Sequence, residues 1–295
     1  MKKTEIKGGT SPYIYRDGIR INREDGPGVS EDYFAKCMKT GRLNGYDTEI
    51  LEALYEQGYM SSHMLQLLLN KPYRSLQNRM AKLKRNGFLI RYYFEYVNGE
   101  SGTEQTVKTA YFYGLGENVR ELYSRFTSAP YRPVFNDTIN VLKRLALNQF
   151  IVDCEIYEKP VTKRLEGFAV QTGDYIFKPG YAIVLPTLEG DTCFVPVVTR
   201  RENNWPEQLI PNLKVLLAAK MPAKATRLIP VVICEDMVHV VQVRKEIEKH
   251  EHIRNLTVAY AIDVAIGGGS VFDTLLFYSG DSEDGQPIFT TTSIK

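Results

Sequence analysis

Apolar residues recur every three or four positions from Ile50 onward, which is the spacing of one buried face of a helix. Asp47 stands where it would cap the N-terminus of that helix, and Gly58 is placed to end it. A second, short apolar helix follows, with Ser61 or Ser62 as its cap. The pattern therefore predicts two helices in close succession.

A third predicted helix begins at Pro72, which suits a first turn. It ends at Gly87, which can take the left-handed conformation of a C-terminal cap. At about 100° per residue, one side of this helix is polar and basic and the other is apolar. The apolar side, which we expect to pack against the first two helices, comprises Tyr73, Leu76, Met80 and Leu83.

Two runs of aromatic and β-branched residues predict strands over residues 88–96 and 107–113, joined by a turn region at 98–102. Three helices followed by a two-stranded ribbon are typical of the winged-helix plan, a relative of helix-turn-helix. The sequence thus predicts a winged helix-turn-helix domain over residues 46–126. The N-terminal arm before it, residues 1–45, has a hairpin signal at Arg16-Asp17-Gly18 and a short helix capped by Ser30.

After Pro160 the pattern changes, because short apolar runs alternate with turn residues. Two predicted helices, 117–126 and 135–157, precede this change, and prolines at 130 and 133 mark a domain boundary between them. The later segments are predicted as strands of one sheet at 175–177, 182–185, 193–198, 228–234 and 257–266, with helices at 207–219 and 237–250.

This alternation indicates an α/β domain with a mixed sheet over residues 127–280. A polar tail, 281–295, follows, with an edge strand at 288–291. The predicted fold class of the whole chain is α+β.

The composition of the chain argues mainly against certain classes of protein: membrane-spanning, secreted and zinc-binding proteins. The 295 residues are 43% hydrophobic and 24% charged with a net charge of +2, which is ordinary for a globular chain. No apolar run approaches the roughly 20 residues of a membrane span, and none follows the first three residues as a secretory signal would. Four cysteines stand apart without a CxxC pair, which argues against zinc and indicates buried thiols of a cytoplasmic protein.

Charge is concentrated on the third helix. Residues 71–91 include seven basic residues and no acidic one. An α-helix fits the major groove with its N-terminal residues nearest the base edges, so Arg74, Ser75 and Asn78 are predicted to read bases. With the ribbon included, the predicted DNA-binding residues are Lys71, Arg74, Ser75, Asn78, Arg79, Lys82, Arg85, Arg91 and Asn98.

Lys82 and Arg85, in the later turns, are predicted to contact phosphates rather than bases. Two other readings of the same face stay open. A basic helix face is often only solvated, although a solvated face normally mixes signs, and some winged helices bind protein instead of DNA.

The second half of the chain shows a family resemblance. Lys178-Pro179-Gly180 precedes a predicted strand, and the next strand, 193–201, contains no carboxylate. The order of elements resembles that of the replication-relaxation proteins of plasmids and conjugative elements. Those proteins join a winged helix to a domain similar to the PD-(D/E)xK nuclease fold. In that family an Arg-Pro-Asp-like segment opens the first strand and the next strand often carries a carboxylate, whereas Gly180 offers no ligand here.

The resemblance implies a nuclease-like domain, and these departures from the family pattern predict that it is catalytically silent, with no catalytic residue, metal or cofactor. We therefore expect a DNA-binding accessory or regulatory protein of a mobile element, active in plasmid replication, conjugation or transcription regulation. Its expected partners are double-stranded DNA, a second copy of the chain, and replication or conjugation proteins. Paired half-sites would favour a homodimer.

Two alternatives remain. One is a live metal-dependent nuclease with relocated ligands, for which Glu166, Glu189 and Asp191 are candidates. The other is a protein-binding adaptor that never touches DNA. His250 and His252 lie close to two glutamates in the sequence, so the residue types are those of metal ligands. At the end of a charged helix, such residues are more typical of a solvated turn.

Overall fold

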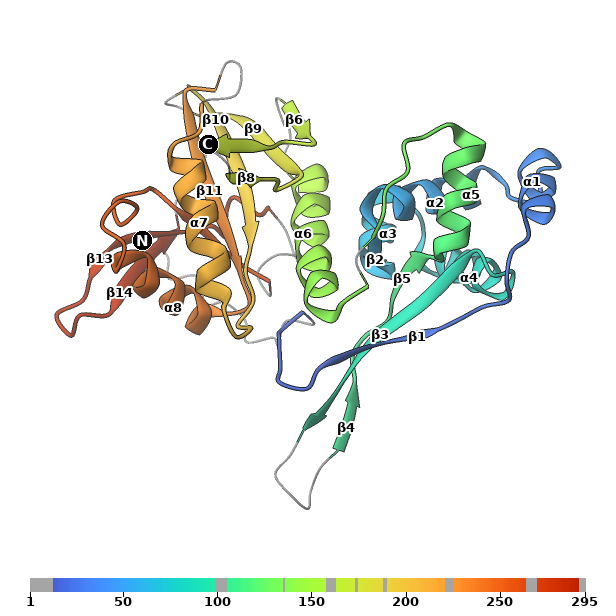
Figure 1. Ribbon diagram of the computed structural model, residues 1–295, viewed down its shortest axis with the longest axis horizontal. Helices are drawn as coiled ribbons and strands as arrows, with labels where there is room; N and C mark the ends of the chain where they lie inside the picture. Colours follow the sequence, from blue (N-terminus) through green and yellow to red (C-terminus); the bar gives the residue numbers. More distant parts are fainter. Residues whose placement is uncertain are drawn as a thin grey trace. The chain divides into compact units, whose positions relative to one another are not determined.

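The chain folds into two compact units that both contain helices and sheet, so the fold is mixed α+β (Figure 1). One unit is formed by Arg16–Asn148 and the other by Met1–Tyr15 with Gln149–Lys295. The division falls inside a helix, later than the predicted boundary at residue 127. The computed structural model describes residues 13–98, 105–134, 136–157, 163–172, 175–187, 190–220, 225–263 and 270–291.

The helices of the first unit agree closely with those predicted from the hydrophobic pattern. Ser30 caps the first of them by accepting the backbone N–H of Tyr33 at 3.3 Å. They are α1 (Glu31–Lys39), α2 (Gly45–Gln57), α3 (Ser62–Leu69), α4 (Tyr73–Arg85), α5 (Glu117–Thr127) and the first part of α6 (Thr138–Tyr157).

The cap of α2 differs from the prediction. Asn44, not Asp47, is the N-cap, and its side chain accepts the backbone N–H of Asp47 at 3.0 Å. The Asp47 carboxylate in turn accepts the N–H of Asn44 at 3.1 Å, which completes a capping box. Gly58 ends the helix with φ 82, as predicted, and Ser61 caps α3.

Side chains of α5 and α6 hold the C-terminal end of α2. Arg120 of α5 donates to the carbonyl of Tyr55 at 2.7 Å. Two side chains of α6 donate to the carbonyl of Gln57, Arg144 through Nε and Asn148 through Nδ2, each at 2.8 Å. The last carbonyls of a helix lack intrahelical partners, so these three side chains supply what α2 itself cannot.

The sheet of the first unit has the strand order β1-β3-β5-β2, with β4 paired to β3. The second predicted strand is divided into β4 and β5, and the turn predicted at 98–102 lies beyond the described residues except for its first. The strands are β1 (Arg20–Glu24), β2 (Tyr59–Ser61), β3 (Leu89–Asn98), β4 (Gln105–Lys108) and β5 (Phe112–Leu115).

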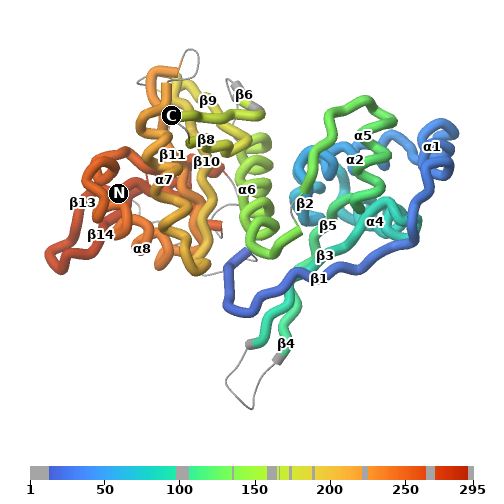
Figure 2. The backbone as a smooth tube through the Cα atoms, viewed as in Figure 1, coloured from blue at the N-terminus to red at the C-terminus, as the bar shows by residue number. Residues whose placement is uncertain are grey.

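The hairpin predicted in the N-terminal arm is wrong. The turn is present, since Ile19 N donates to Arg16 O at 3.0 Å and Gly18 has φ 74. However, the strand that follows it, β1, pairs antiparallel with β3 over five residues instead of folding back on residues 13–15. The long β3 offers an edge that the short segment before the turn cannot match. β4 and the end of β3 extend away from the helices of this unit (Figure 2).

The second unit is built on a seven-stranded mixed sheet of order β14-β13-β12-β11-β10-β9-β6. β10 and β12 both run parallel to β11, and the other neighbours are antiparallel. The strands are β6 (Lys163–Glu166), β9 (Tyr181–Thr187), β10 (Gly190–Val198), β11 (Arg227–Cys234), β12 (Ala259–Ile262), β13 (Leu276–Asp281) and β14 (Pro287–Thr291).

Two expectations about this sheet need correction. The segment at 175–177 forms β8 (Tyr175–Phe177), which pairs only with β7 (Val170–Thr172) in a separate ribbon. Tyr175 and Ile176 are exposed, and only Phe177 of this strand is half-buried, where it packs against the edge of the core cluster. The predicted edge strand in the tail is present as β14, but it pairs with β13, which the sequence pattern missed.

Apolar residues fill both faces of this sheet, as expected for parallel strands covered on two sides. One face packs against α7 (Trp205–Leu217) and α8 (Met237–Glu248) in a single core cluster. On the other face Phe194 contacts Phe272, with ring centroids 4.7 Å apart. The four cysteines are buried free thiols. Within the described residues, every helix is too short or too polar to cross a membrane.

Candidate nucleic-acid interface

The helix α4 is amphipathic, and its apolar side is anchored as the sequence predicts. Leu76, Met80 and Leu83 are at most 1% exposed. Tyr73, expected to pack with them, is instead 50% exposed. It is the first residue of α4, and it lies beyond the buried stripe.

The opposite side of α4 carries basic and amide side chains that are accessible to solvent. Arg74, Asn78 and Arg85 are exposed and Lys82 is half-buried. Among the described residues, none of these four makes an ion pair or a hydrogen bond. Ser75, also predicted to read bases, is exposed beside them. The structure therefore brings five predicted residues together on one accessible helix face.

Arg79 has a different role, because it holds α4 on α2. Its Nε donates to Oδ1 of Asp47 at 2.8 Å, and its Nη2 pairs with Oδ2 of the same carboxylate. Asp47 is fully buried. A buried carboxylate needs such a partner, so this ion pair fixes the position of the basic face.

Lys71 and Arg91 are also paired. Lys71 Nζ lies 3.1 Å from Oε2 of Glu49. Arg91 Nε donates to Oε2 of Glu24 at 2.8 Å, and Lys84 Nζ donates to the same oxygen at 2.6 Å. The hydrogen bond from Lys84, joined by those of Arg91, lowers the pKa of Glu24, which stays ionised and neutralises part of this basic region.

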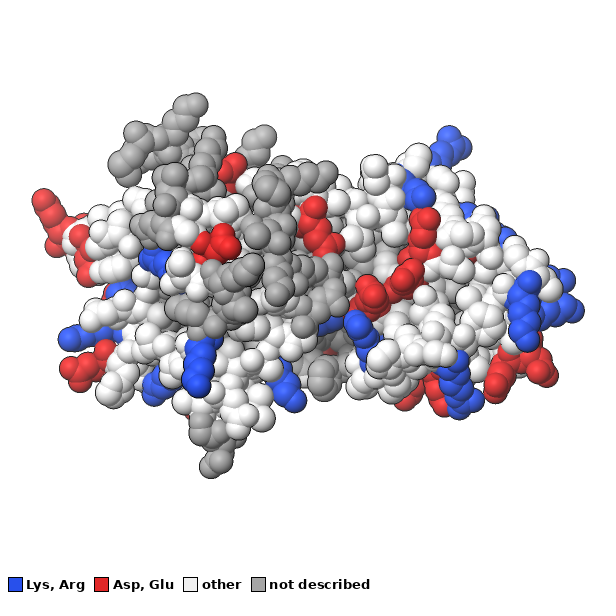
Figure 3. All heavy atoms as spheres, turned by 90° about the horizontal axis from the view of Figure 1, so that it is seen from above, with Lys and Arg blue, Asp and Glu red and all other residues white. Residues whose placement is uncertain are grey.

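The strand ribbon adds cations stacked on tyrosine rings. The Arg91 guanidinium lies 4.1 Å from the ring centroid of Tyr111, and Lys108 Nζ lies 4.8 Å from that of Tyr93. Asn98, the last predicted site residue, ends β3, and its side chain lies outside the described part of the chain. The face of the molecule in Figure 3 shows acidic and basic side chains interspersed.

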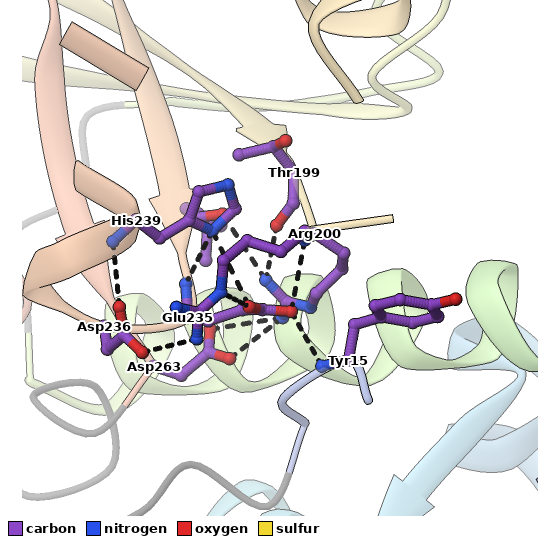
Figure 4. A network of polar contacts seen from close by, with 9 residues as sticks. Tyr15, Thr199, Arg200, Glu235, Asp236, His239 and Asp263 are labelled. Carbon is purple, nitrogen blue, oxygen red and sulfur yellow. Dashed lines mark hydrogen bonds and ion pairs between the residues drawn. The ribbon is translucent and has the colours of Figure 1, made fainter. Parts of the chain in front are cut away.

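A second polar group lies at the carboxyl ends of three strands in the seven-stranded sheet. Because β10, β11 and β12 run parallel, the residues that follow them meet at one edge: Arg200 after β10, Glu235 after β11 and Asp263 after β12 (Figure 4). All three are buried. Ligands of open α/β sheets commonly bind at this edge.

We call the polar residues at this edge of the sheet the edge network: Arg200, Arg201, Glu235, Asp236, His239 and Asp263. Arginines neutralise its carboxylates. Arg200 Nη2 lies 3.0 Å from Oδ2 of Asp263. Arg201 Nε donates to Oε2 of Glu235 at 2.6 Å, and its Nη2 donates to Oδ2 of Asp236 at 2.5 Å. Each carboxylate is thus held by a guanidinium group, which leaves fewer of its oxygens for a metal ion.

A buried histidine completes the edge network. His239 accepts the backbone N–H of Glu235 at Nδ1, at 3.4 Å, while its Nε2 is buried and has no hydrogen-bond partner in the described ranges. Burial, reinforced by the positive charge of Arg200, lowers the pKa of His239 to about 3, so the imidazole is neutral. The backbone N–H of Tyr15 donates to Oε1 of Glu235 at 2.7 Å, which ties the start of the described chain to this edge.

Glu166 and Asp191, two of the residues considered as relocated nuclease ligands, lie toward opposite ends of β9, because Glu166 pairs with Tyr181 and Asp191 pairs with Pro186. Gly180 is in the left-handed region with φ 76, just before β9. Asp191 lies near the start of β10, opposite Pro186, at the other end of the strand from Arg200. The side chains of Glu166 and Glu189 lie outside the described residues.

The histidines near the end of α8 also do not form a metal site. His250 Nε2 lies 3.6 Å from Oε1 of Glu246, and Arg244 Nε donates to Oε1 of Glu248 at 2.8 Å. Throughout the described ranges, no three side chains of the histidine, cysteine or carboxylate type converge as metal ligands.

The edge network was missed at the sequence level. Its signal was present, since Glu235-Asp236 and Asp263 directly follow runs of buried apolar residues. Their convergence depends on the parallel order of β10, β11 and β12, which the sequence pattern alone did not specify.

Comparisons of this chain with protein families, curated proteins and solved structures found one weak structural match. No family model matches the chain, and no curated protein does. Among solved structures, the restriction endonuclease FokI aligns with a TM-score of 0.29 and 14% sequence identity. The alignment covers 75% of this chain and 43% of the FokI chain, so the chain spans less than half of that enzyme's length.

Proposed function

We propose that this chain binds duplex DNA through the exposed face of α4. The observation that carries the proposal is a row of side chains on that face with no ion pair or hydrogen bond among the described residues: Arg74, Asn78, Lys82 and Arg85. Unpaired cations on a rigid helix attract phosphates and release counterions from DNA. A solvated face would carry carboxylates among its cations, and α4 has none.

The proposed mode is that of a winged helix, with α4 in the major groove. The first turns of α4 present Arg74 and Asn78 to base edges, where Arg pairs with guanine and Asn with adenine. Lys82 and Arg85 contact phosphates of the DNA backbone, because they lie in the later turns of α4. The ribbon of β3 and β4 is the proposed wing. The Arg79–Asp47 ion pair keeps the helix in position.

The cellular role we propose is that of an accessory or regulatory protein of a mobile element, in plasmid replication, transfer or transcription. One recognition helix contacts a short stretch of DNA, so we further propose that two copies bind paired half-sites. The second unit then serves assembly rather than cleavage, because arginines hold the carboxylates at its sheet edge.

The test is binding to a pool of duplex DNA across a salt series. Reversal of charge in Lys82→Glu/Arg85→Glu should abolish salt-sensitive binding. The matched control is Lys214→Glu/Lys220→Glu, which changes the net charge equally at two exposed lysines of the other unit. Equal binding by all three proteins contradicts the proposal, and absence of binding by the wild type at low salt favours a protein-binding adaptor.

Single substitutions separate the two kinds of contact. Arg85→Ala should weaken binding to all sequences and lower the salt slope by about 0.9. Arg74→Ala or Asn78→Ala should instead cost about 1–3 kcal/mol on the preferred sequence and relax the preference. If these variants behave alike, α4 does not read bases.

A further inference from the structure

A hollow of about 300 Å³ borders the C-terminal half of α4, on the side facing α1 and the segment before α2. Arg42, Lys82 and Asn86 line it, together with the buried Asp47 and apolar side chains. A cavity of this size is at the small end of ligand sites and is large enough for a phosphate with its adjoining sugar.

The hollow carries an excess of positive charge. Arg42 is exposed and Lys82 is half-buried, and neither has an ion-pair partner among the residues that the structure describes. The carboxylate of Asp47 does not neutralise them, because Arg79 already holds both of its oxygens. The amide group of Asn86 makes no hydrogen bond with the described residues and can donate into the same space.

We infer that this hollow binds a phosphate group. A guanidinium fork matches the oxygens of phosphate, an ammonium group supplies a second charge, and an amide N–H₂ supplies a further donor. Arg42, Lys82 and Asn86 provide one of each.

The source of the phosphate is the DNA backbone, and in this respect the inference rests on the proposed function. Lys82 lies at the junction of two surfaces. It follows Asn78 by one helical turn on the proposed DNA-binding face, and it also lines the hollow. DNA that lies along α4 therefore passes the mouth of the hollow. The inference therefore adds Arg42, which lies outside α4, to the residues that contact a phosphate of the DNA backbone.

The first experiment measures duplex DNA binding across a salt series for the full chain and for Arg42→Ala. The salt slope should fall by about 0.9, the share of one phosphate contact. Arg42 is exposed and has no ion-pair partner within the described part of the chain, so the variant should keep the wild-type circular dichroism spectrum and Tm. Lys214→Ala, an exposed lysine of the other unit, is the matched control and should leave the slope unchanged.

The second experiment titrates inorganic phosphate against chloride at equal ionic strength and follows the NMR signals of the Asn86 side-chain amide. Saturable shifts that Arg42→Ala removes would assign the hollow to phosphate. This assignment would hold even if the wild type binds no DNA, and that absence of DNA binding would overturn the proposed function. An unchanged salt slope with normal wild-type DNA binding would overturn the DNA source alone. An unchanged slope together with no saturable shift would overturn the phosphate site and leave the proposed function standing.

Discussion

Acid should destabilise the second unit through His239. Its imidazole is fully buried with a pKa lowered to about 3, against about 6.5 in an unfolded chain. Below pH 6.5 the unfolded chain binds a proton that the folded chain excludes, so the contribution of His239 to stability is present above pH 6.5 and is lost as the pH falls toward 3. Between pH 7 and pH 5 this loss amounts to about 2 kcal/mol.

The comparison is with His239→Asn, which keeps an acceptor for the Glu235 N–H but cannot take up a proton. Urea denaturation at pH 7 and pH 5 gives the free energy of unfolding of both proteins. Carboxylates titrate in both and cancel in the difference, so the variant should gain about 2 kcal/mol relative to wild type on going to pH 5. Parallel losses in the two proteins would refute the assignment of a neutral buried imidazole.

Three further predictions concern packing. Arg79→Leu should lower the free energy of unfolding by about 3–5 kcal/mol in urea denaturation, because it leaves the buried Asp47 carboxylate without its cation; a smaller loss would mean that the capping box alone satisfies this carboxylate. Gly87→Ala should lower Tm by several degrees, since Gly87 has φ 80 and a Cβ there would lie 1.9 Å from Pro27 O; an unchanged Tm would contradict that close approach. The four thiols should not react with Ellman's reagent at pH 8 until urea unfolds the protein, because all are buried and burial raises the pKa of Cys193 to about 12. Labelling of the folded chain would contradict their burial.

Local signals made the helices predictable. Ser30, Ser61 and Gly58 act on the residues beside them, so their effect on a helix end is visible in a short window of sequence. Strand pairing depends on distant residues instead. β1 pairs with β3 about 70 residues later, and nothing near β1 specifies that partner. β13 was missed because it contains Ser279-Gly280-Asp281, which has little strand character.

The same distinction applies to the site. The exposed face of α4 follows from helical periodicity, so Arg74 and Arg85 are where the sequence places them. The engagement of Arg79 with Asp47 depends on how α2 packs on α4, and that of Arg91 with Glu24 depends on the pairing of β1 with β3. Periodicity identifies which side chains leave the core but cannot show which of them meet a partner from another element.

The support of α2 by later helices sets the limits of any N-terminal fragment that folds alone. A fragment ending at residue 126 would keep Arg120 but lose Arg144 and Asn148, and the carbonyl of Gln57 would lose both of its donors. The smallest autonomous fragment should therefore extend to Asn148, where the first compact unit ends. The helix that reads DNA in our proposal thus depends for its folding on residues more than fifty positions downstream, so truncations designed from the DNA-binding motif alone should yield unstable protein.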